Sequence, residues 1–142
     1  MIEIYTDGAY ANSRNQGGWA FVVLKDGKKI FSKYDSVLNT TNNRMEVQAS
    51  IEAIKYMKTQ NIKEFTLYSD SMYLIGTMTK NWKKNKNLDL WVEMEEVIPE
   101  LNINWKHVKG HAGNTFNSYC DMLAVHATKI NINNENWYKI WY

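Results

Sequence analysis

Three short β-rich runs lie at the start of the chain, and apolar and polar residues alternate in the first of them. The first covers Ile2–Asp7 and stops at Asp7-Gly8, where the pattern predicts a turn. The second and third cover residues 19–25 and 28–34, and Asp26-Gly27 separates them. Asp-Gly between two β-rich runs is a strong signal for a hairpin. We therefore predict three consecutive antiparallel strands.

From residue 42 onward the apolar positions follow a helical period instead. Val47, Ile51 and Ile54 lie on one stripe, which predicts a helix that ends near Thr59. The remaining predicted elements are a strand over 65–70, a helix over 71–79, a helix over 88–98, a strand over 103–108, a loop over 110–113 and a helix over 115–130. The order βββαβααβα predicts an α/β fold with a mixed five-stranded sheet.

Four acidic residues are predicted to meet at one edge of this sheet. The strands that begin at residues 2, 65 and 103 should run parallel, because a helix precedes each return to the sheet. Asp7 and Asp70 then end neighbouring strands at the same edge. Glu46 is expected in the first turn of its helix and Asp121 about two turns into the last helix, both beside this edge. Open α/β sheets bind their ligands there.

A cluster of four carboxylates favours metal chemistry. Like charges that crowd together must protonate, separate or bind cations. Oxygen ligands suit Mg²⁺ or Mn²⁺, and shared carboxylates suit a two-metal site for phosphoryl chemistry. Taken alone, each acid has a simpler interpretation: Asp7 as part of a turn, Glu46 at a helix N-terminus, Asp70 as an N-cap and Asp121 as a solvated helix residue. Only their joint placement predicts a metal site.

Composition limits the class of protein. The 142 residues suit one domain, and 44% hydrophobic residues with 13% aromatics suffice for a core. One cysteine excludes a disulfide framework and a cysteine-based zinc site. The sequence has no long apolar run and no signal-peptide pattern, so we expect a soluble, cytoplasmic protein without a membrane partner. The net charge of +2 says little about partners.

Four motifs resemble those of the ribonuclease H type 1 family. They are Tyr5-Thr6-Asp7-Gly8-Ala9 followed by Gly17-Gly18-Trp19, then Thr40–Glu46, then Tyr68–Tyr73, and finally Val108–Asn114 with Asn117 and Cys120–Ala124. The pieces TTNNRMEV and KGHAGN are the most specific, and all four stand in the family's order. The resemblance runs from Ile2 to about Lys129, and the predicted element order is also that of the ribonuclease H fold.

The resemblance implies an endonuclease that cuts the RNA strand of an RNA–DNA hybrid with two Mg²⁺ ions and leaves 5′-phosphate and 3′-hydroxyl ends. It implies that Asp7 bridges both ions, that Asp121 holds the ion on the nucleophile side, and that Glu46 and Asp70 hold the other. His111 would act in proton transfer or product release, which suits its ordinary pKa. The simpler interpretation of His111 is a loop residue that caps the last helix.

The same resemblance implies a set of substrate contacts. Gly8, Ser13, Asn43 and Arg44 would touch the minor groove or the RNA backbone, and 2′-hydroxyls mark RNA there. The pocket for a phosphate of the DNA strand would consist of Thr41, Arg44 and Asn87, with Trp91 as a nearby DNA contact and Asn117 as a further substrate residue. Helical spacing with Leu88 also allows Trp91 to be a core residue.

Three positions depart from the family pattern. Ser13 replaces a common Asn, and Met72 stands where Gln is common and cannot form the same hydrogen bonds. A long basic insertion found in many members is reduced here to Trp82–Asn87. Residues 71–88 still contain four lysines (Lys80, Lys83, Lys84, Lys86) and no acid. We predict weaker hybrid affinity than in members with the long insertion, although a merely solvated turn is the alternative.

The end of the chain is rich in aromatic residues. We divide the chain into a catalytic domain over 1–130 and a tail over 131–142, in which Trp137, Ile140 and Trp141 share a helical face. We expect the tail to pack on the domain, and the alternative is a docking site for a partner or nucleic acid. His107 and His126 are interpreted as structural or exposed, and nothing demands more than a monomer.

Two other functions stay open at this point. One is a catalytically silent nucleic-acid-binding domain of the same fold, against which the intact set of four acids argues. The other is the same chemistry on a different RNA-containing duplex.

Overall fold

A computed structural model describes residues 1–109 and 115–132 of the chain. Its elements are β1 (Ile2–Ala11), the 3-10 helix η1 (Asn12–Arg14), β2 (Gln16–Lys25), β3 (Lys28–Leu38), α1 (Asn42–Thr59), β4 (Glu64–Ser69), α2 (Met72–Thr79), α3 (Leu88–Val97), β5 (Asn102–His107) and α4 (Thr115–Ala127). Apart from the short η1, this is the order that the sequence predicts.

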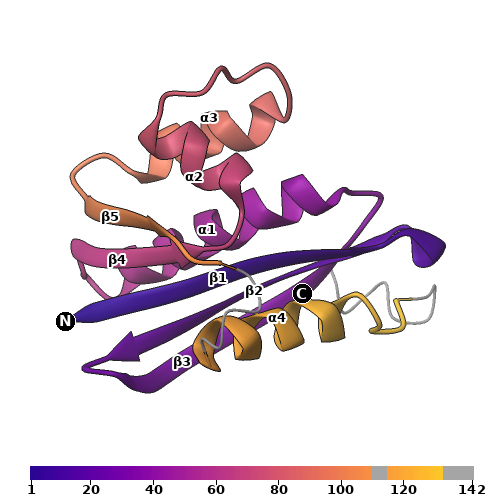
Figure 1. Cartoon of the computed structure of the whole chain (residues 1–142), viewed down its shortest axis with the longest axis horizontal. Coiled ribbons are helices and arrows are strands. Elements are labelled where there is room, and N and C mark those ends of the chain that lie inside the picture. Colours follow the sequence, from indigo (N-terminus) through magenta and orange to yellow (C-terminus); the bar gives the residue numbers. More distant parts are fainter. Residues whose placement is uncertain (110–114, 133–142) are drawn as a thin grey trace.

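The five strands form one mixed sheet in the order β3-β2-β1-β4-β5 (Figure 1). Strands β1, β2 and β3 pair antiparallel, whereas β4 runs parallel to β1 and β5 runs parallel to β4. The predicted α/β class, with three antiparallel strands followed by two parallel ones, is confirmed. It is also the arrangement that brings the carboxyl end of β4 beside the middle of β1.

The predicted end of the first strand is wrong. Strand β1 continues past Asp7 and Gly8 to Ala11, because β2 pairs with it residue by residue along its whole length. Asp7 lies opposite Ala20 and Gly8 opposite Trp19 in this ladder. Asp7-Gly8 is therefore a mid-strand dipeptide and not a turn. The end of α4 at Ala127 is likewise earlier than the predicted end at residue 130.

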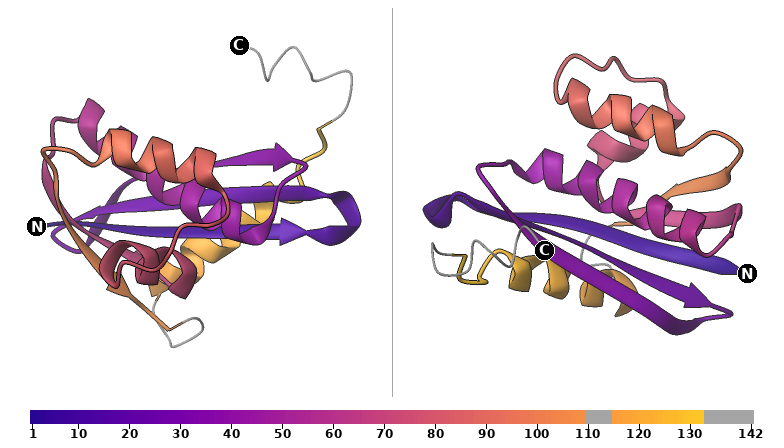
Figure 2. Two further views of the ribbon diagram at one scale, coloured as in Figure 1. Left: turned by 90° about the horizontal axis from the view of Figure 1, so that it is seen from above. Right: turned by 180° about the vertical axis from the view of Figure 1, so that it is seen from behind.

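Helices cover both faces of the sheet. Figures 1 and 2 show α1, α2 and α3 on one face and α4 on the other. Alternate residues of a strand point to opposite faces of the sheet. In β2, Phe21 and Val23 belong to the core under α1, while Ala20 and Val22 belong to the core under α4. Burial on both faces explains why β2 is apolar without interruption over residues 19–24.

Two glycines let the helices approach the sheet at backbone distance. A Cβ atom on Gly8 of β1 would lie 2.4 Å from the backbone of Met45 and Glu46 in α1. A Cβ atom on Gly18 of β2 would lie 2.3 Å from the carbonyl oxygen of Ala124 in α4. No other residue type fits at such distances. The helices that carry Glu46 and Asp121 are thus pressed against the strands on either side.

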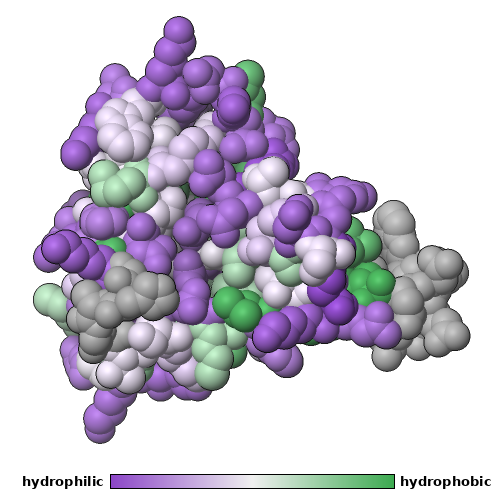
Figure 3. All heavy atoms as spheres, turned by 45° about the vertical axis from the view of Figure 1, so that its right-hand side comes forward, coloured by the Kyte–Doolittle hydropathy of each residue, from purple (hydrophilic) through white to green (hydrophobic). Residues whose placement is uncertain are grey.

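Exposed apolar side chains do not gather into one broad area on the face drawn in Figure 3, where polar residues dominate and hydrophobic ones form small separate patches. No helix among residues 1–109 and 115–132 is long and apolar enough to span a membrane. The aromatic part of the tail, including Trp137, Ile140 and Trp141, lies outside the described residues, so its predicted packing is not tested.

Candidate active site

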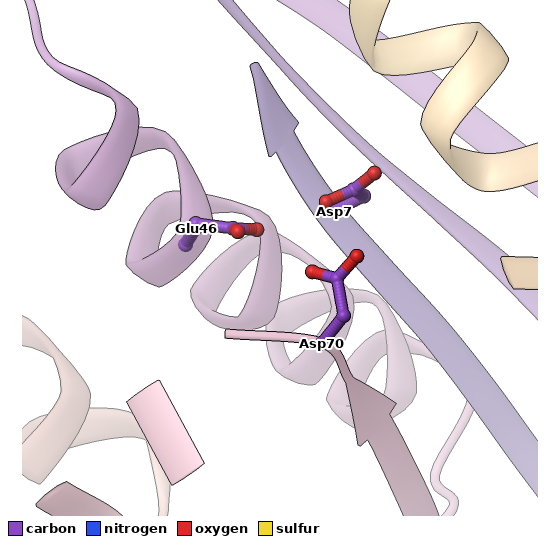
Figure 4. Close-up of side chains that lie close together, drawn as sticks. All are labelled: Asp7, Glu46 and Asp70. Atoms are coloured by element: carbon purple, nitrogen blue, oxygen red, sulfur yellow. The ribbon is translucent and has the colours of Figure 1, made fainter. Parts of the chain in front are cut away.

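Three carboxylates from three separate elements point toward one another (Figure 4). Asp7 comes from β1, Glu46 from α1, and Asp70 directly follows β4. One oxygen of each lies within 4.8 Å of the others, a spacing that fits the ligands of a metal ion. Asp7 is 3% exposed and Glu46 6% exposed, so two of the three acids are buried. The predicted convergence of these residues is what the structure shows.

Strand register brings Asp7 and Asp70 together. The parallel ladder between β1 and β4 pairs Glu3 with Thr66 and Tyr5 with Tyr68. Asp7 and Asp70 each follow two residues later on their strands, so they lie side by side. The hydroxyl of Ser71 accepts a hydrogen bond from the N–H of Leu74 and caps α2. Asp70 is therefore not the N-cap, and its carboxylate is available for the cluster.

Glu46 reaches the cluster because α1 contacts β1 at Gly8. The backbone N–H of Gly8 donates to Asp7 Oδ1 at 3.0 Å and to Glu46 Oε1 at 2.7 Å. Thr41 caps α1 by accepting from the N–H of Arg44, and the first turn of the helix contains no acid. The expectation that Glu46 lies in the first turn is thus wrong by a small margin. The buried small residues Ala49, Ser50 and Ala53 allow the close packing.

Asp121 is the fourth predicted acid. Its carboxylate oxygens do not belong to the group of oxygens that lie within 4.8 Å of one another. It extends from α4 on the opposite face of the sheet. Its carboxyl group is close enough to contribute to the raised pKa values of Asp7, Glu46 and Asp70. The four predicted acids therefore form one electrostatic unit.

Burial and mutual repulsion make this unit unstable when it is fully ionised. Burial, followed by the charges of Glu46 and Asp70, raises the pKa of Asp7 to about 11. Burial and the charge of Asp70 raise the pKa of Glu46 to about 8, and burial with Asp121 also raises the pKa of Asp70. Asp7 Oδ2 is buried without a hydrogen-bond partner in the described part of the chain. A divalent cation would relieve the repulsion and satisfy this oxygen, so the residues fit a metal site.

Two further residues contact predicted site residues but were not themselves assigned to the site from the sequence. His107 ends β5, and its Nε2 atom lies 3.3 Å from the backbone carbonyl oxygen of Asp70. Asp89, in the first turn of α3, forms an ion pair with Arg44. Because Ser69 pairs with His107 in the β4–β5 ladder, His107 lies beside Asp70, the residue that follows Ser69. His111, the predicted proton-transfer residue, lies outside the described residues.

The predicted substrate residues have different surroundings. Ser13, Thr41 and Asn43 are exposed, and Arg44 and Asn87 are partly exposed and hydrogen-bonded to each other. Gly8 is buried, and its N–H is already donated to Asp7 and Glu46.

Two of the residues predicted to contact the substrate have buried side chains. Asn117 is 3% exposed, in α4. Trp91 is 2% exposed in the main core, and its indole N–H donates to the hydroxyl of Tyr73. This position agrees with the alternative interpretation of Trp91 as a core residue, and Leu90 and Met94 of the same helix belong to the same core.

Comparisons with known proteins agree with this geometry. The RNase H family model matches residues 1–129. A ribonuclease H of Caldanaerobacter subterraneus is 42% identical over 93% of this chain and 94% of its own length. Ribonuclease HI of Haemophilus influenzae is 44% identical over 87% of each chain. The fold resembles that of LC11-RNase H1 in complex with an RNA/DNA hybrid, with a TM-score of 0.76 and 21% identity over 90% of this chain and 96% of the other.

The family model covers nearly all of the chain, and the relatives match it over most of their own length. The three grouped carboxylates and the order of the strands are those expected from the sequence motifs. The chain therefore belongs to the ribonuclease H family, endonucleases that hydrolyse the RNA strand of RNA–DNA hybrids.

Proposed function

We propose that this chain cleaves RNA–DNA hybrids with two divalent ions, Mg²⁺ in the first place and Mn²⁺ as an alternative, and leaves 5′-phosphate and 3′-hydroxyl ends. The observation that carries the proposal is the approach of Asp7, Glu46 and Asp70 to within 4.8 Å, with two of them buried. Carboxylate oxygens without sulfur or imidazole favour these hard cations.

Each acid has a proposed position around the metal ions. In this proposal Asp7 contributes to both ion positions, because its carboxylate is grouped with those of Glu46 and Asp70 and its pKa is also raised by Asp121. Glu46 and Asp70 would hold the ion at the leaving group, and Asp121 the ion at the attacking water. When bound, such ions activate a water molecule and stabilise the charge on the departing oxygen.

The chain's own residues prepare this site before any ion binds. The Gly8 N–H holds the carboxylates of Asp7 and Glu46 in fixed orientations. Asp7 is only 3% exposed, and this burial limits its movement. Rigid placement of ligands on strands and helices is what a metal-dependent hydrolase requires.

The exposed residues Ser13 and Asn43 lie on the segments that flank β1 and open α1. We propose that they contact the minor groove of the hybrid, where the RNA strand exposes its 2′-hydroxyls. This contact would make the choice of an RNA-containing strand independent of base sequence.

The decisive experiment measures Mg²⁺-dependent cleavage of a matched RNA–DNA hybrid, an RNA duplex and a DNA duplex of one sequence. The hybrid should be cut in its RNA strand, and the two other duplexes should remain intact. Asp70→Asn is the control for the metal site, and Glu96→Gln, on the exposed part of α3, is the matched control for loss of a carboxylate. An intact hybrid, or equal cutting by Asp70→Asn, would refute the proposal.

A further inference from the structure

The guanidinium of Arg44 is held at one end by two residues that precede and begin α3. Its Nη1 donates to Asp89 Oδ1 at 2.9 Å and its Nη2 to Asp89 Oδ2 at 2.7 Å. Nη1 also donates to Asn87 Oδ1 at 3.3 Å. Because a guanidinium has five N–H groups, these hydrogen bonds use three of them. The pair with Asp89 is bidentate, which fixes orientation as well as distance.

Asn87 is itself held in place. Its backbone has φ = 57°, in the left-handed region that Asn tolerates, and it is the residue before α3. Its side-chain amide donates to the hydroxyl of Tyr73 at 3.0 Å, and the same hydroxyl accepts from the buried Trp91 at 3.2 Å. The hydrogen bond to Arg44 therefore continues through Asn87 and Tyr73 into the core.

The two remaining donors of Arg44 share one edge of the guanidinium. They are the Nε–H and the second N–H of Nη2, and they point in parallel from the side of the group. Within the described part of the chain, Asp89 and Asn87 are the acceptors that Arg44 contacts. The side chain is 30% exposed, so a ligand in solution can reach it. Two parallel N–H groups form the arrangement that binds a phosphate in bidentate fashion.

We propose that Asp89, together with Asn87, is a positioning residue that holds Arg44 end-on, so that its Nε–Nη2 edge receives a backbone phosphate of the bound hybrid. The inference rests on the proposed function, since Arg44 precedes Glu46 by two residues in α1, the helix that carries one of the clustered acids.

Asp89 has two opposite effects on such a phosphate. Its negative charge repels the phosphate, and its bond to Arg44 restricts a side chain that otherwise has many rotamers. Asp89 is 65% exposed, so water and salt screen its charge, whereas the bidentate geometry persists. We therefore expect positioning to outweigh repulsion, and loss of Asp89 to weaken binding.

A double-mutant cycle separates these effects. All variants carry Asp70→Asn so that a fluorescent hybrid duplex stays intact, and its dissociation constant is measured by anisotropy at several salt concentrations. Asp89→Ala should weaken binding about fivefold and lower the salt slope by about one, because Arg44 no longer holds its phosphate. In the Arg44→Ala background the same change should have no effect. Glu96→Ala removes an acid from the same helix and should leave the affinity unchanged.

Several outcomes would overturn the inference. Tighter binding by Asp89→Ala in both backgrounds would show that Asp89 acts by repulsion alone. Equal weakening in both backgrounds, with a lower melting temperature, would show that it only stabilises the start of α3. Cleavage of the hybrid by the unmodified chain is measured in parallel. Failure there refutes the proposed function, whereas normal cleavage without coupling between Arg44 and Asp89 refutes only this inference.

Discussion

Asp7 and Asp70 lie side by side two residues beyond Tyr5 and Tyr68, the last registered pair of the parallel β1–β4 ladder. Asp7 is at that point still within the antiparallel ladder to β2, where it pairs with Ala20. β1 therefore continues while β4 ends, and the acid at the end of β4 meets an acid in the middle of β1. The buried position of Asp7 and the partly exposed position of Asp70 follow from this offset.

Replacement of Asp70 by Asn should abolish most of the cleavage while leaving the fold intact. Loss of residues that only support a metal ligand costs about 10- to 100-fold, so loss of a ligand should cost at least about 100-fold. The metal-free variant should also melt a few degrees higher, because Asp70 repels Asp7 and Glu46. Initial rates of hybrid cleavage and melting curves in EDTA check both expectations. A variant with lower activity and lower melting temperature would point to misfolding instead.

The stability of the metal-free protein should fall as the pH rises from about 4 to about 8. In the unfolded chain, Asp and Glu release their protons near pH 4. In the folded protein, the pKa of Glu46 is about 8 and that of Asp7 about 11, so the folded state keeps protons that the unfolded state has released. Stability therefore decreases with pH, by on the order of 1 kcal/mol per pH unit for such a group.

Urea unfolding at pH 5, 6, 7 and 8, with EDTA or with saturating Mg²⁺, measures this effect. Bound cations favour the ionised acids, so Mg²⁺ should flatten the decline and stabilise the protein more at pH 8 than at pH 5. Asp7→Asn should reduce the decline in EDTA. Identical pH dependence with and without Mg²⁺ would contradict the assignment of these shifts to the metal site.

Replacement of Gly8 by Ala should damage both stability and activity. The added Cβ would lie 2.4 Å from the backbone of Met45 and Glu46, which a packed helix cannot move away from cheaply. We expect a loss of about 3 kcal/mol on urea unfolding, as for other overpacked sites. Gly27→Asn is the matched control, because Gly27 has φ = 81° and open space around it. An unchanged melting temperature for Gly8→Ala would show that α1 does not contact β1 as closely as described.

The exposed lysines between α2 and α3 should contribute a modest electrostatic attraction for the hybrid. Replacement of Lys80, Lys83 and Lys86 by Gln should weaken binding and lower the salt slope by up to about 2.7, or about 0.9 for each phosphate that a lysine neutralises. Lys84→Gln should have a smaller effect, because Lys84 pairs with Glu95 at 3.2 Å. Binding titrations of the Asp70→Asn chain at several salt concentrations give both values. An unchanged slope would mean that the segment is only a solvated turn.

The sequence by itself determined the order of the elements and the identity of the acids. β-rich runs and a helical period are local properties, so they predicted the strands around Ile4, Phe21 and Leu67 and the helix around Ile51 correctly. The helix in each crossover then indicated parallel strands, and with them the approach of Asp7 to Asp70. The local signal failed at Asp7-Gly8, because pairing with β2 is a nonlocal interaction that overrides the turn preference of an Asp-Gly pair.

Only the tertiary structure decided how the side chains divide between core and surface. Trp91 and Leu88 are three residues apart in α3, yet Trp91 is buried and Leu88, the first residue of the helix, is 56% exposed. The pairing of Arg44 with Asp89, 45 residues apart in sequence, depends on the placement of α3 against α1. The sequence specifies which residues are acids and which is the arginine. The distances that group the acids as a metal site and orient the arginine for a phosphate arise only when the helices pack on the sheet.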